Sequence, residues 1–450
     1  MHWGGKETST TSYILDLNGI TFAVQLCILL IIGPYADYGT WRPYILMFIN
    51  SLGIIVEVIE ALLDKPRLWQ ANSAMYVLGT VCFNCCVAFF NGAFPGIVRD
   101  LPEMIESEQQ VLLGQKTAEE HDQAIMMERS RINNRLQACS SLGVAICIGI
   151  GIGISQGIGS ATPQKQYEQY AAIIGFFAAI WLLVSIPYFV CQKFRPGQKL
   201  PDGTKWYLAG PTQVWQAAKT IRYLKHTFFW IFGYFLIVDC YSTTGSIVNI
   251  LQNNAISFSA LEYSGLFLVV YGTSFIGYVA MDFIQRRFGI PPKYMFLWTS
   301  VWIVFMCLWG VIGIWTTKIG FHNEWEFWFY QGFLGLMTPG LFSYAPVILA
   351  EVAPAPKVYL FFALMNSVSQ TSTFIGPFIC GAIINRANGN TNYAFWFTFL
   401  TGLIGIACVA LLSVPKAKRD CLIYLEKESE DLYHGRHDEN AQEDNVVTEA

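Results

Sequence analysis

Long apolar stretches alternate with short polar ones along most of this chain. Residues 68–98 and 136–164 contain no charged residue over 31 and 29 positions. An uncharged apolar run of about 18 residues or more is typical of a transmembrane helix. The pattern predicts eleven spans, near residues 12–36, 43–63, 71–97, 134–159, 168–192, 226–252, 260–283, 294–316, 327–351, 358–385 and 393–415.

Two long polar connections divide these spans. Residues 98–133 form a charge-rich loop after the third span, and residues 193–225 form a basic linker after the fifth. The linker is the natural boundary between an N-terminal bundle of five spans (residues 1–192) and a C-terminal bundle of six (residues 226–415). The remaining residues, 416–450, are acidic and poor in apolar side chains, so we expect a disordered tail.

Composition agrees with a polytopic, all-α membrane protein. Hydrophobic residues make up 54% of the chain and charged residues 13%, whereas soluble domains carry roughly 25% charged residues. A soluble enzyme, a nucleic-acid-binding protein and a secreted disulfide scaffold are therefore excluded. Most of the 12 cysteines lie inside apolar spans, as Cys82, Cys85 and Cys86 do. Buried thiols are the better interpretation there, since the spans offer no second pair of zinc ligands.

The distribution of basic residues predicts the orientation. When alternate loops are assigned to opposite sides, the side that contains Arg42 receives 22 of the lysines and arginines and the other side receives 6. Basic loops stay on the cytoplasmic side of a membrane. The C-terminal tail is therefore predicted to be cytoplasmic, and the N-terminus to lie on the opposite side.

The first polar loop carries a distinctive motif. It reads Gly33-Pro-Tyr-Ala-Asp37-Tyr-Gly39-Thr-Trp-Arg42-Pro43 and resembles the cytoplasmic loop motif of the major facilitator superfamily. Glycines permit a tight turn between antiparallel helices, and an aspartate can cap a helix N-terminus. An arginine can pair with a carboxylate across the bundle. An ordinary polar loop is the alternative interpretation.

A weaker echo of this motif occurs in the second bundle. Its residues are Gly277, Asp282, Arg286, Arg287, Gly289 and Lys293. Related loops in two halves are typical of internally repeated transporters. Asp282, Arg286 and Glu351 lie at cytoplasmic span ends, so we interpret them as gate or capping residues together with the first loop.

Further fragments sharpen the resemblance. They are Phe90-Asn91-Gly92-Ala93-Phe94-Pro95, Arg129-Ser-Arg131-Ile-Asn-Asn, Gly233 to Asp239, Gln331-Gly332 to Glu351-Val-Ala-Pro354, Phe361-Phe362 and Gly376-Pro377. In this order they resemble the autophagy-related protein 22 family of fungal vacuolar transporters, over roughly residues 12–415. The resemblance implies a two-bundle major facilitator fold of six plus six helices. Only eleven spans are predicted here, so the family's first helix would be missing.

Polar residues inside the spans are the candidate substrate site. A charge at the bilayer centre costs at least ~2.5–3.5 kcal/mol, so such residues usually face a cavity or a partner. At 100° per residue, one face of the span 226–252 collects six polar side chains. They are Asp239, Ser242, Thr243, Ser246, Asn249 and Asn253. We expect Asp239 to accept an ammonium group or a proton, although hydrogen bonding between helices is the simpler alternative.

Two other spans carry shorter polar stripes. The span 358–385 contains Asn366, Ser369, Gln370 and Thr373, and the third span contains Asn84 and Asn91. In the superfamily these helices contribute to a central cavity. Gly149, Gly153 and Gly157 lie on one face of the fourth span, which favours close helix packing.

No enzyme motif or nucleotide-binding loop is found in the sequence, and no cofactor is implied. We therefore expect a secondary transporter of small solutes with the lipid bilayer as its environment. The resemblance implies a vacuolar membrane and efflux of amino acids after autophagic degradation. Two alternatives stay open: another facilitator that carries sugars, drugs or monocarboxylates, and a truncated membrane protein that transports nothing. The residues point to no protein partner.

Overall fold

A computed structural model describes residues 2–3, 6–7, 10–63, 65–159, 162–193, 197, 224–255, 260–387 and 389–427. Nearly all of these residues are helical. The only regular strands among them are the antiparallel pair β1 (His2–Trp3) and β2 (Lys6–Glu7). The predicted all-α class is confirmed.

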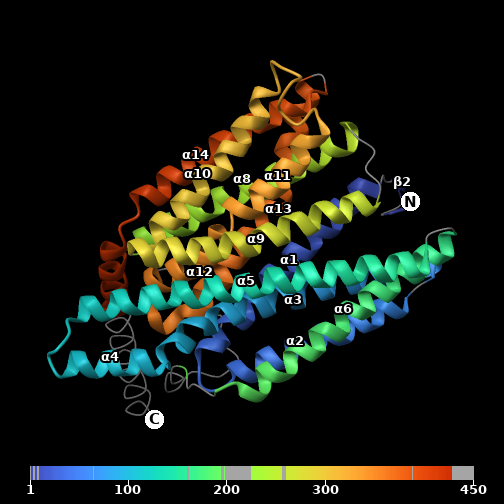
Figure 1. Cartoon of the computed structure of the whole chain (residues 1–450). Helices are drawn as coiled ribbons and strands as arrows, with labels where there is room; N and C mark the ends of the chain where they lie inside the picture. Colours follow the sequence, from blue (N-terminus) through green and yellow to red (C-terminus); the bar gives the residue numbers. More distant parts are fainter. Residues whose placement is uncertain are drawn as a thin grey trace, which may run out of the picture.

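The described helices form two groups (Figure 1). The first group is α1 (Thr10–Asp37), α2 (Arg42–Leu62), α3 (Trp69–Arg99), α4 (Pro102–Leu112), α5 (Ala118–Ile158) and α6 (Pro163–Cys191). The second group is α8 (Lys225–Ala255), α9 (Ala260–Phe288), α10 (Pro292–Ile312), α11 (Glu324–Met337), α12 (Gly340–Val352), α13 (Val358–Arg386) and α14 (Ala394–Leu411). Short 3₁₀ turns join some of them: η1 (Pro66–Leu68), η3 (Ala355–Lys357) and η4 (Thr391–Tyr393).

Ten membrane-spanning segments are long and apolar enough in the described part of the chain. The helix α13 has 29 residues, but the side chains of residues 370–374 within it lie outside the description. The count of eleven spans and the missing first helix therefore stay predictions. The basic linker, 193–225, also lies almost entirely outside the described residues.

The predicted polar connection 98–133 is largely helical rather than an irregular loop. Residues 102–112 form α4, and α5 begins at Ala118, far ahead of the expected start at 134. A capping box starts α5: Thr117 accepts the backbone N–H of Glu120, whose carboxylate accepts the N–H of Thr117. With 41 residues, α5 is about 61 Å long, roughly twice a bilayer's hydrocarbon core. Its first turns therefore project beyond the membrane, beside α4 (Figure 1).

The span predicted at 327–351 is found at Glu324–Val352. Its helix is interrupted between α11 and α12 at Pro339, which has no N–H to continue the hydrogen-bond ladder. The expectation for the C-terminal tail needs correction. The tail is not disordered from residue 416 onward, since residues 414–427 form a helix. We call this segment the C-terminal helix. Residues 428–450 lie outside the description.

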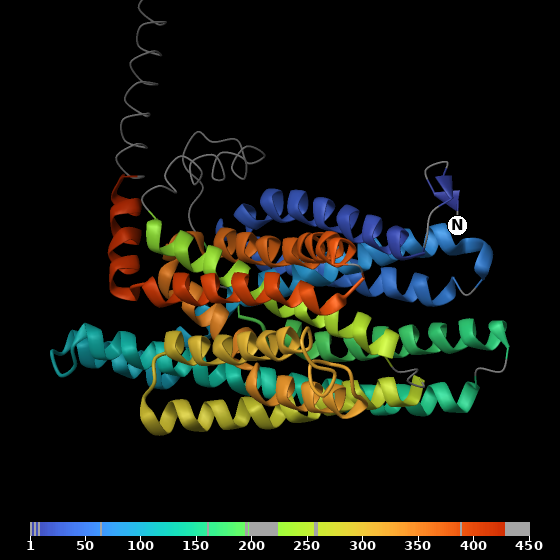
Figure 2. The same ribbon diagram turned by 90° about the horizontal axis from the view of Figure 1, so that it is seen from above.

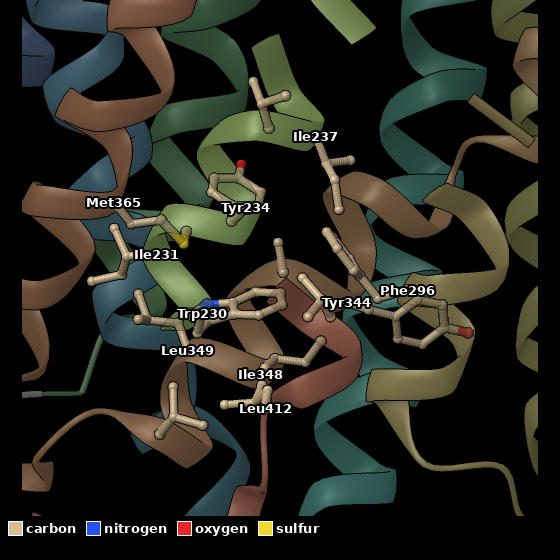
Figure 3. Packing of buried hydrophobic residues seen from close by; sticks show 14 of the residues in the cluster. Trp230, Ile231, Tyr234, Ile237, Phe296, Tyr344, Ile348, Leu349, Met365 and Leu412 are labelled. Carbon is tan, nitrogen blue, oxygen red and sulfur yellow. The ribbon is translucent and has the colours of Figure 1, made fainter. Parts of the chain in front are cut away.

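The C-terminal bundle has the larger continuous core. Trp230 packs edge-on against Phe296, with ring centroids 5.0 Å apart, and neither ring is exposed. Tyr344, Ile348 and neighbouring aliphatic residues surround these rings (Figure 3). This packing fixes α8 against α10 and α12.

The two bundles differ in how deeply their spanning helices are buried. In the C-terminal bundle, α8 lies between α12, α13 and α14, and 67% of its span is buried. In the N-terminal bundle only 6% of the α6 span is buried. Two cavities of about 490 and 340 Å³ open beside α6, and both are lined by α2 and α3 as well. The helix α6 is therefore the least buried span of the described N-terminal bundle.

The glycine stripe of α5 does not pack as predicted. A Cβ added at Gly149, Gly153 or Gly157 would meet no neighbouring atom within 4 Å. The small residues therefore do not bring another described helix close. The bundles instead meet along two other seams, α1 against α13 and α5 against α9.

Candidate functional site

A polar cavity lies inside the C-terminal bundle, between α8, α9 and α11. It measures about 230 Å³. Three of the predicted stripe residues line it from α8: Ser242, Ser246 and Asn249. Facing them are Tyr263 of α9 and Gln331 of α11, together with other aromatic and aliphatic side chains. No charged residue is among the described side chains that line the cavity.

Two serine hydroxyls that line the cavity donate hydrogen bonds within α8. Ser242 donates to the carbonyl of Val238 at 2.8 Å, and Ser246 donates to that of Ser242 at 3.1 Å. Each hydroxyl oxygen keeps acceptor capacity and can rotate toward a bound molecule. The α8 face can therefore offer both donors and acceptors to a polar solute.

Asp239 and Thr243 lie on the adjoining face of α8, toward α13. The carboxylate accepts a hydrogen bond from Thr243 Oγ1 at 3.3 Å, and Asp239 is 3% exposed. At Gly376 of α13 there is no room for a side chain, because a Cβ there would collide with Thr243. The predicted stripe is thus divided between the cavity and the α8–α13 contact. Asp239 still lies only one turn from Ser242, about 4.5 Å along the helix axis.

The asparagines predicted on α3 and α13 meet between the bundles. Asn366 Nδ2 donates to the backbone carbonyl of Asn84 at 2.8 Å, and Asn84 Nδ2 donates to Gln25 Oε1 of α1 at 2.9 Å. The Nε2 group of Gln25 is buried without a partner. Sequence reasoning missed Gln25, although an amide within an otherwise apolar span was the available signal.

Asn91, a further substrate candidate, lies apart from the cavity between α8, α9 and α11. Asn91 lines the 490 Å³ cavity of the N-terminal bundle, between α2, α3, α5 and α6. The side chains of Gln370, Thr373 and Asn253 lie outside the described residues. No group of three or more His, Cys, Asp or Glu side chains that could hold a metal ion occurs in the described part of the chain.

The first loop motif connects the two bundles. Asp37, the last residue of α1, is 4% exposed, and its carboxylate accepts the backbone N–H groups of Tyr359 and Leu360 at 3.0 and 3.2 Å. These groups belong to the first turn of α13, where N–H groups have no partner within the helix. A negative charge is also favoured at that end of the helix dipole. Asp37 therefore caps a helix of the opposite bundle.

Other motif residues support the same contact. Arg42 donates to the hydroxyl of Tyr359 at 2.6 Å. Gly33 lets α1 approach α13, since a Cβ there would lie 3.1 Å from Ala363 Cβ. Gly39 has a φ of +53°, a conformation that glycine adopts without strain. Gly33, Asp37, Gly39 and Arg42 of the motif thus each have a local physical role.

A buried ion pair joins the two bundles between α5 and α12. Arg129 Nη1 of α5 and Glu351 Oε1 of α12 are 2.5 Å apart, and the side chains are 5% and 6% exposed. Removing Glu351 would leave Arg129 buried without its carboxylate, and breaking a buried pair in this way costs about 3–5 kcal/mol. The sequence motif Arg129-Ser-Arg131 was recognised, but its partner could not be read from the chain.

Polar contacts extend this seam toward the membrane centre. Asn133 Nδ2 donates to the carbonyl of Ser343 at 2.5 Å, and Asn134 Nδ2 donates to the hydroxyl of Tyr344 at 3.1 Å. Ser343 also donates to Asn134 Oδ1. The ends of the two bundles near Arg42 and Arg129 are therefore in contact. We call this end the basic side.

The second loop motif acts within its own bundle. Asp282 pairs with Arg286 one turn later in α9, at 2.6 Å. Lys293 donates to the carbonyls of Ala410 and Leu412, at 2.8 and 2.6 Å, and so caps the end of α14. These contacts, unlike those of Asp37 and Arg42, lie within one bundle.

Replacing Arg129 by glutamine is expected to open the basic side. Glu351 then loses its cation from α5, so the closed arrangement loses stability. We expect a cysteine substituted for the buried Ser343 to react with a water-soluble maleimide at least ~10-fold faster in the Arg129→Gln background, because each 1.4 kcal/mol is a factor of ten. Arg286→Gln is the matched control, since its ion pair lies within α9. Equal rates in the Arg129→Gln and control proteins would show that the Arg129–Glu351 pair does not hold the basic side closed.

A family model described as "Vacuole effluxer Atg22 like" matches residues 1–422. The chain belongs to this family. The autophagy-related protein 22 of Chaetomium globosum is 22% identical over 449 residues, covering 89% of this chain and 68% of the relative. Autophagy-related protein 22-1 of Sclerotinia sclerotiorum is 20% identical, covering 93% of this chain and 77% of the relative. The predicted resemblance to the Atg22 family is confirmed.

Solved structures of major facilitator transporters have the same fold. The proton:xylose symporter XylE aligns with a TM-score of 0.61 at 10% identity, over 89% of this chain and 86% of that one. FucP in the outward conformation aligns with a TM-score of 0.58 at 13% identity, over 91% of both chains. With the Atg22 family membership, this fold identifies a membrane transporter of the secondary type and not an enzyme.

Proposed function

We propose that this Atg22-family chain exports amino acids from the vacuole to the cytosol by alternating access. The single observation that carries the proposal is the polar face of α8. Ser242, Ser246 and Asn249 line a cavity from it, with Asp239 one turn away. A hydrogen-bonding face beside a buried carboxylate has the chemistry that a zwitterion needs.

Asp239, the charged side chain that lies one turn from the cavity, favours an amino acid over an anion. An ammonium group can pair with Asp239, while hydroxyl and amide groups such as Ser246 and Asn249 can bind the carboxylate. A monocarboxylate would find no cation among the described side chains that line the cavity. A buried anion without a partner is strongly disfavoured, so the monocarboxylate alternative is the weaker one.

The contacts on the basic side indicate which side of the membrane is closed in this form of the transporter. Asp37, Arg42 and the Arg129–Glu351 pair hold the two bundles together there. The positive-inside rule assigns this side to the cytosol, with the C-terminus. We infer that the described form is closed to the cytosol and takes its substrate from the vacuolar lumen. The two bundles, 1–192 and 226–415, then rock about the site.

The vacuolar location and the efflux direction rest on family membership. The family description names a vacuole effluxer, and the relatives are autophagy-related proteins. Amino acids are the products of protein breakdown in such a compartment. No ATP-binding motif occurs in the sequence, so transport would follow a gradient.

A sugar is the second candidate, and the aromatic rings of the cavity favour it. Tyr241, Tyr263 and Tyr330 line the same space as the serines. Aromatic side chains present flat apolar faces together with hydroxyl groups. A sugar has no ammonium group, so its binding would not depend on Asp239.

A counterflow assay distinguishes these substrates. Purified chain in liposomes preloaded with leucine should accumulate labelled leucine, and excess unlabelled amino acids should compete while xylose and lactate should not. Ser246→Leu fills the cavity and should reduce counterflow by about tenfold, the effect of ~1.4 kcal/mol. Thr401→Leu is the matched control, because Thr401 also bonds within its own helix, α14. Competition by xylose alone would instead support the sugar transporter.

A further inference from the structure

The C-terminal helix, residues 414–427, is fixed to the C-terminal bundle. Tyr424 is fully buried, and its hydroxyl accepts a hydrogen bond from Lys357 Nζ at 3.0 Å. Cys421 Sγ donates to the carbonyl of Val352 at 3.2 Å. Figure 2 shows the helix turning away from α14 across the end of the bundle. These contacts predict that the helix moves with the C-terminal bundle.

One side chain of this helix reaches the seam between the bundles. Lys418 Nζ lies 3.1 Å from Glu351 Oε2 and 2.7 Å from Asp122 Oδ2 of α5. Arg129 occupies the other oxygen of Glu351. A single buried carboxylate is therefore shared by two cations, one from each bundle.

The two contacts of Lys418 differ in environment. Asp122 and Lys418 are 56% and 38% exposed, whereas the Glu351 side chain is 6% exposed. An exposed ion pair contributes about 0.2–1 kcal/mol. Burial lowers the pKa of Lys418, but the carboxylates of Glu351 and Asp122 outweigh it, so that its pKa is raised. The lysine therefore stays charged beside Glu351.

Separation of the bundles affects the two cations of Glu351 differently. Arg129 belongs to α5 and leaves with the N-terminal bundle. Lys418 belongs to the C-terminal helix and stays with α12. Glu351 also borders apolar residues, since Ile348 and Leu412 line the same crevice. Lys293 lines this crevice too, but its ammonium group is bound to the carbonyls of Ala410 and Leu412. Without Lys418, opening would therefore leave this carboxylate without a paired cation from its own bundle among the described residues.

We propose that Lys418 is a positioning residue of the transport cycle, which keeps Glu351 neutralised while the basic side opens. Lys418 thus promotes opening, although in the closed form it also touches the opposite bundle. The inference rests on the alternating access of the proposed function but not on the identity of the substrate. If Lys418 only held the two bundles together, removing it would make the basic side open more readily.

The test uses the full chain with a cysteine substituted for the buried Ser343 as a reporter of opening. Its rate of reaction with a water-soluble maleimide follows even rare openings, and mass spectrometry separates it from the native cysteines. We expect Lys418→Gln to lower the rate at least about fivefold, the lower end of typical coupling between sites. Lys416→Gln, an exposed position on the same helix, should leave the rate unchanged. Asp122→Asn should raise it by less than about fivefold.

A second variant separates this role from a general loss of structure. In the Glu351→Gln background there is no charge left to neutralise, so adding Lys418→Gln should no longer slow the reaction. A rate that rises or stays the same in Lys418→Gln overturns the proposal, as does an equal slowing in both backgrounds. A reporter that never reacts in the otherwise unchanged chain would overturn alternating access itself, and this inference with it.

Discussion

Glutamine at position 326 is expected to destabilise the protein strongly. Glu326 is fully buried at the start of α11, close to the end of the bundle away from the basic side. One carboxylate oxygen accepts the backbone N–H groups of Gly320 and Phe321, both at 2.7 Å, and the indole N–H of Trp309 at 2.8 Å. A single side chain thus holds the loop between α10 and α11.

The second oxygen completes the same arrangement. It accepts the backbone N–H groups of His322 and Asn323, each at 3.1 Å. Glu326→Gln turns one acceptor into a donor that faces other donors. Each buried donor left unpaired costs ~1–3 kcal/mol, so the free energy of unfolding should fall by at least ~2 kcal/mol.

The measurement is the thermal unfolding midpoint of the detergent-purified protein. Glu324→Gln is the matched control, because Glu324 lies two residues earlier in the same helix and is exposed. The Glu326 variant should melt well below the parent, whereas the control should change stability by no more than about 0.5 kcal/mol. Similar midpoints for both variants would show that the hydrogen bonds accepted by Glu326 contribute little to stability.

Asparagine at position 239 is expected to abolish most transport and leave the fold intact. The change keeps the shape of the side chain and its hydrogen bond with Thr243, but it removes the only carboxylate that we place at the substrate site. Hydrogen bonds to charged groups contribute about 1.5–3 kcal/mol, which corresponds to a loss of roughly ten- to a hundredfold in transport rate.

Leucine counterflow measures this loss, and the unfolding midpoint checks the fold. Thr243→Val is the matched control, since it removes the neighbouring hydroxyl while the carboxylate remains. It should lose less activity than Asp239→Asn. Full activity in the Asp239 variant would show that the carboxylate has no role in substrate binding, and would favour the sugar alternative.

Most of the fold was predictable because apolar runs long enough to cross a bilayer leave few alternatives. The error at α5 arose from treating charge as a sign of a loop. Its first turns are charged because they project into water, although Thr117 and Glu120 form a capping signal that the sequence shows. The break at Pro339 was also visible as a proline, but an apolar run does not reveal whether a helix continues through it.

The candidate site was predictable only in part. A helical wheel places Asp239, Ser242 and Ser246 on one face, but it cannot show that the cavity takes the serines while Asp239 faces α13. Contacts between distant residues are hidden in the same way. The motif residue Asp37 was found, yet its partners in α13 lie 322 and 323 positions away.

Release of labelled leucine from intact vacuoles tests the central claim most directly. Vacuoles from cells that produce the chain, from cells that produce Asp239→Asn at the same level, and from cells that lack it are preloaded with labelled leucine. We expect rapid release only from the first, with the variant resembling vacuoles without the chain. Equal release from all three would contradict a vacuolar amino-acid exporter that depends on Asp239.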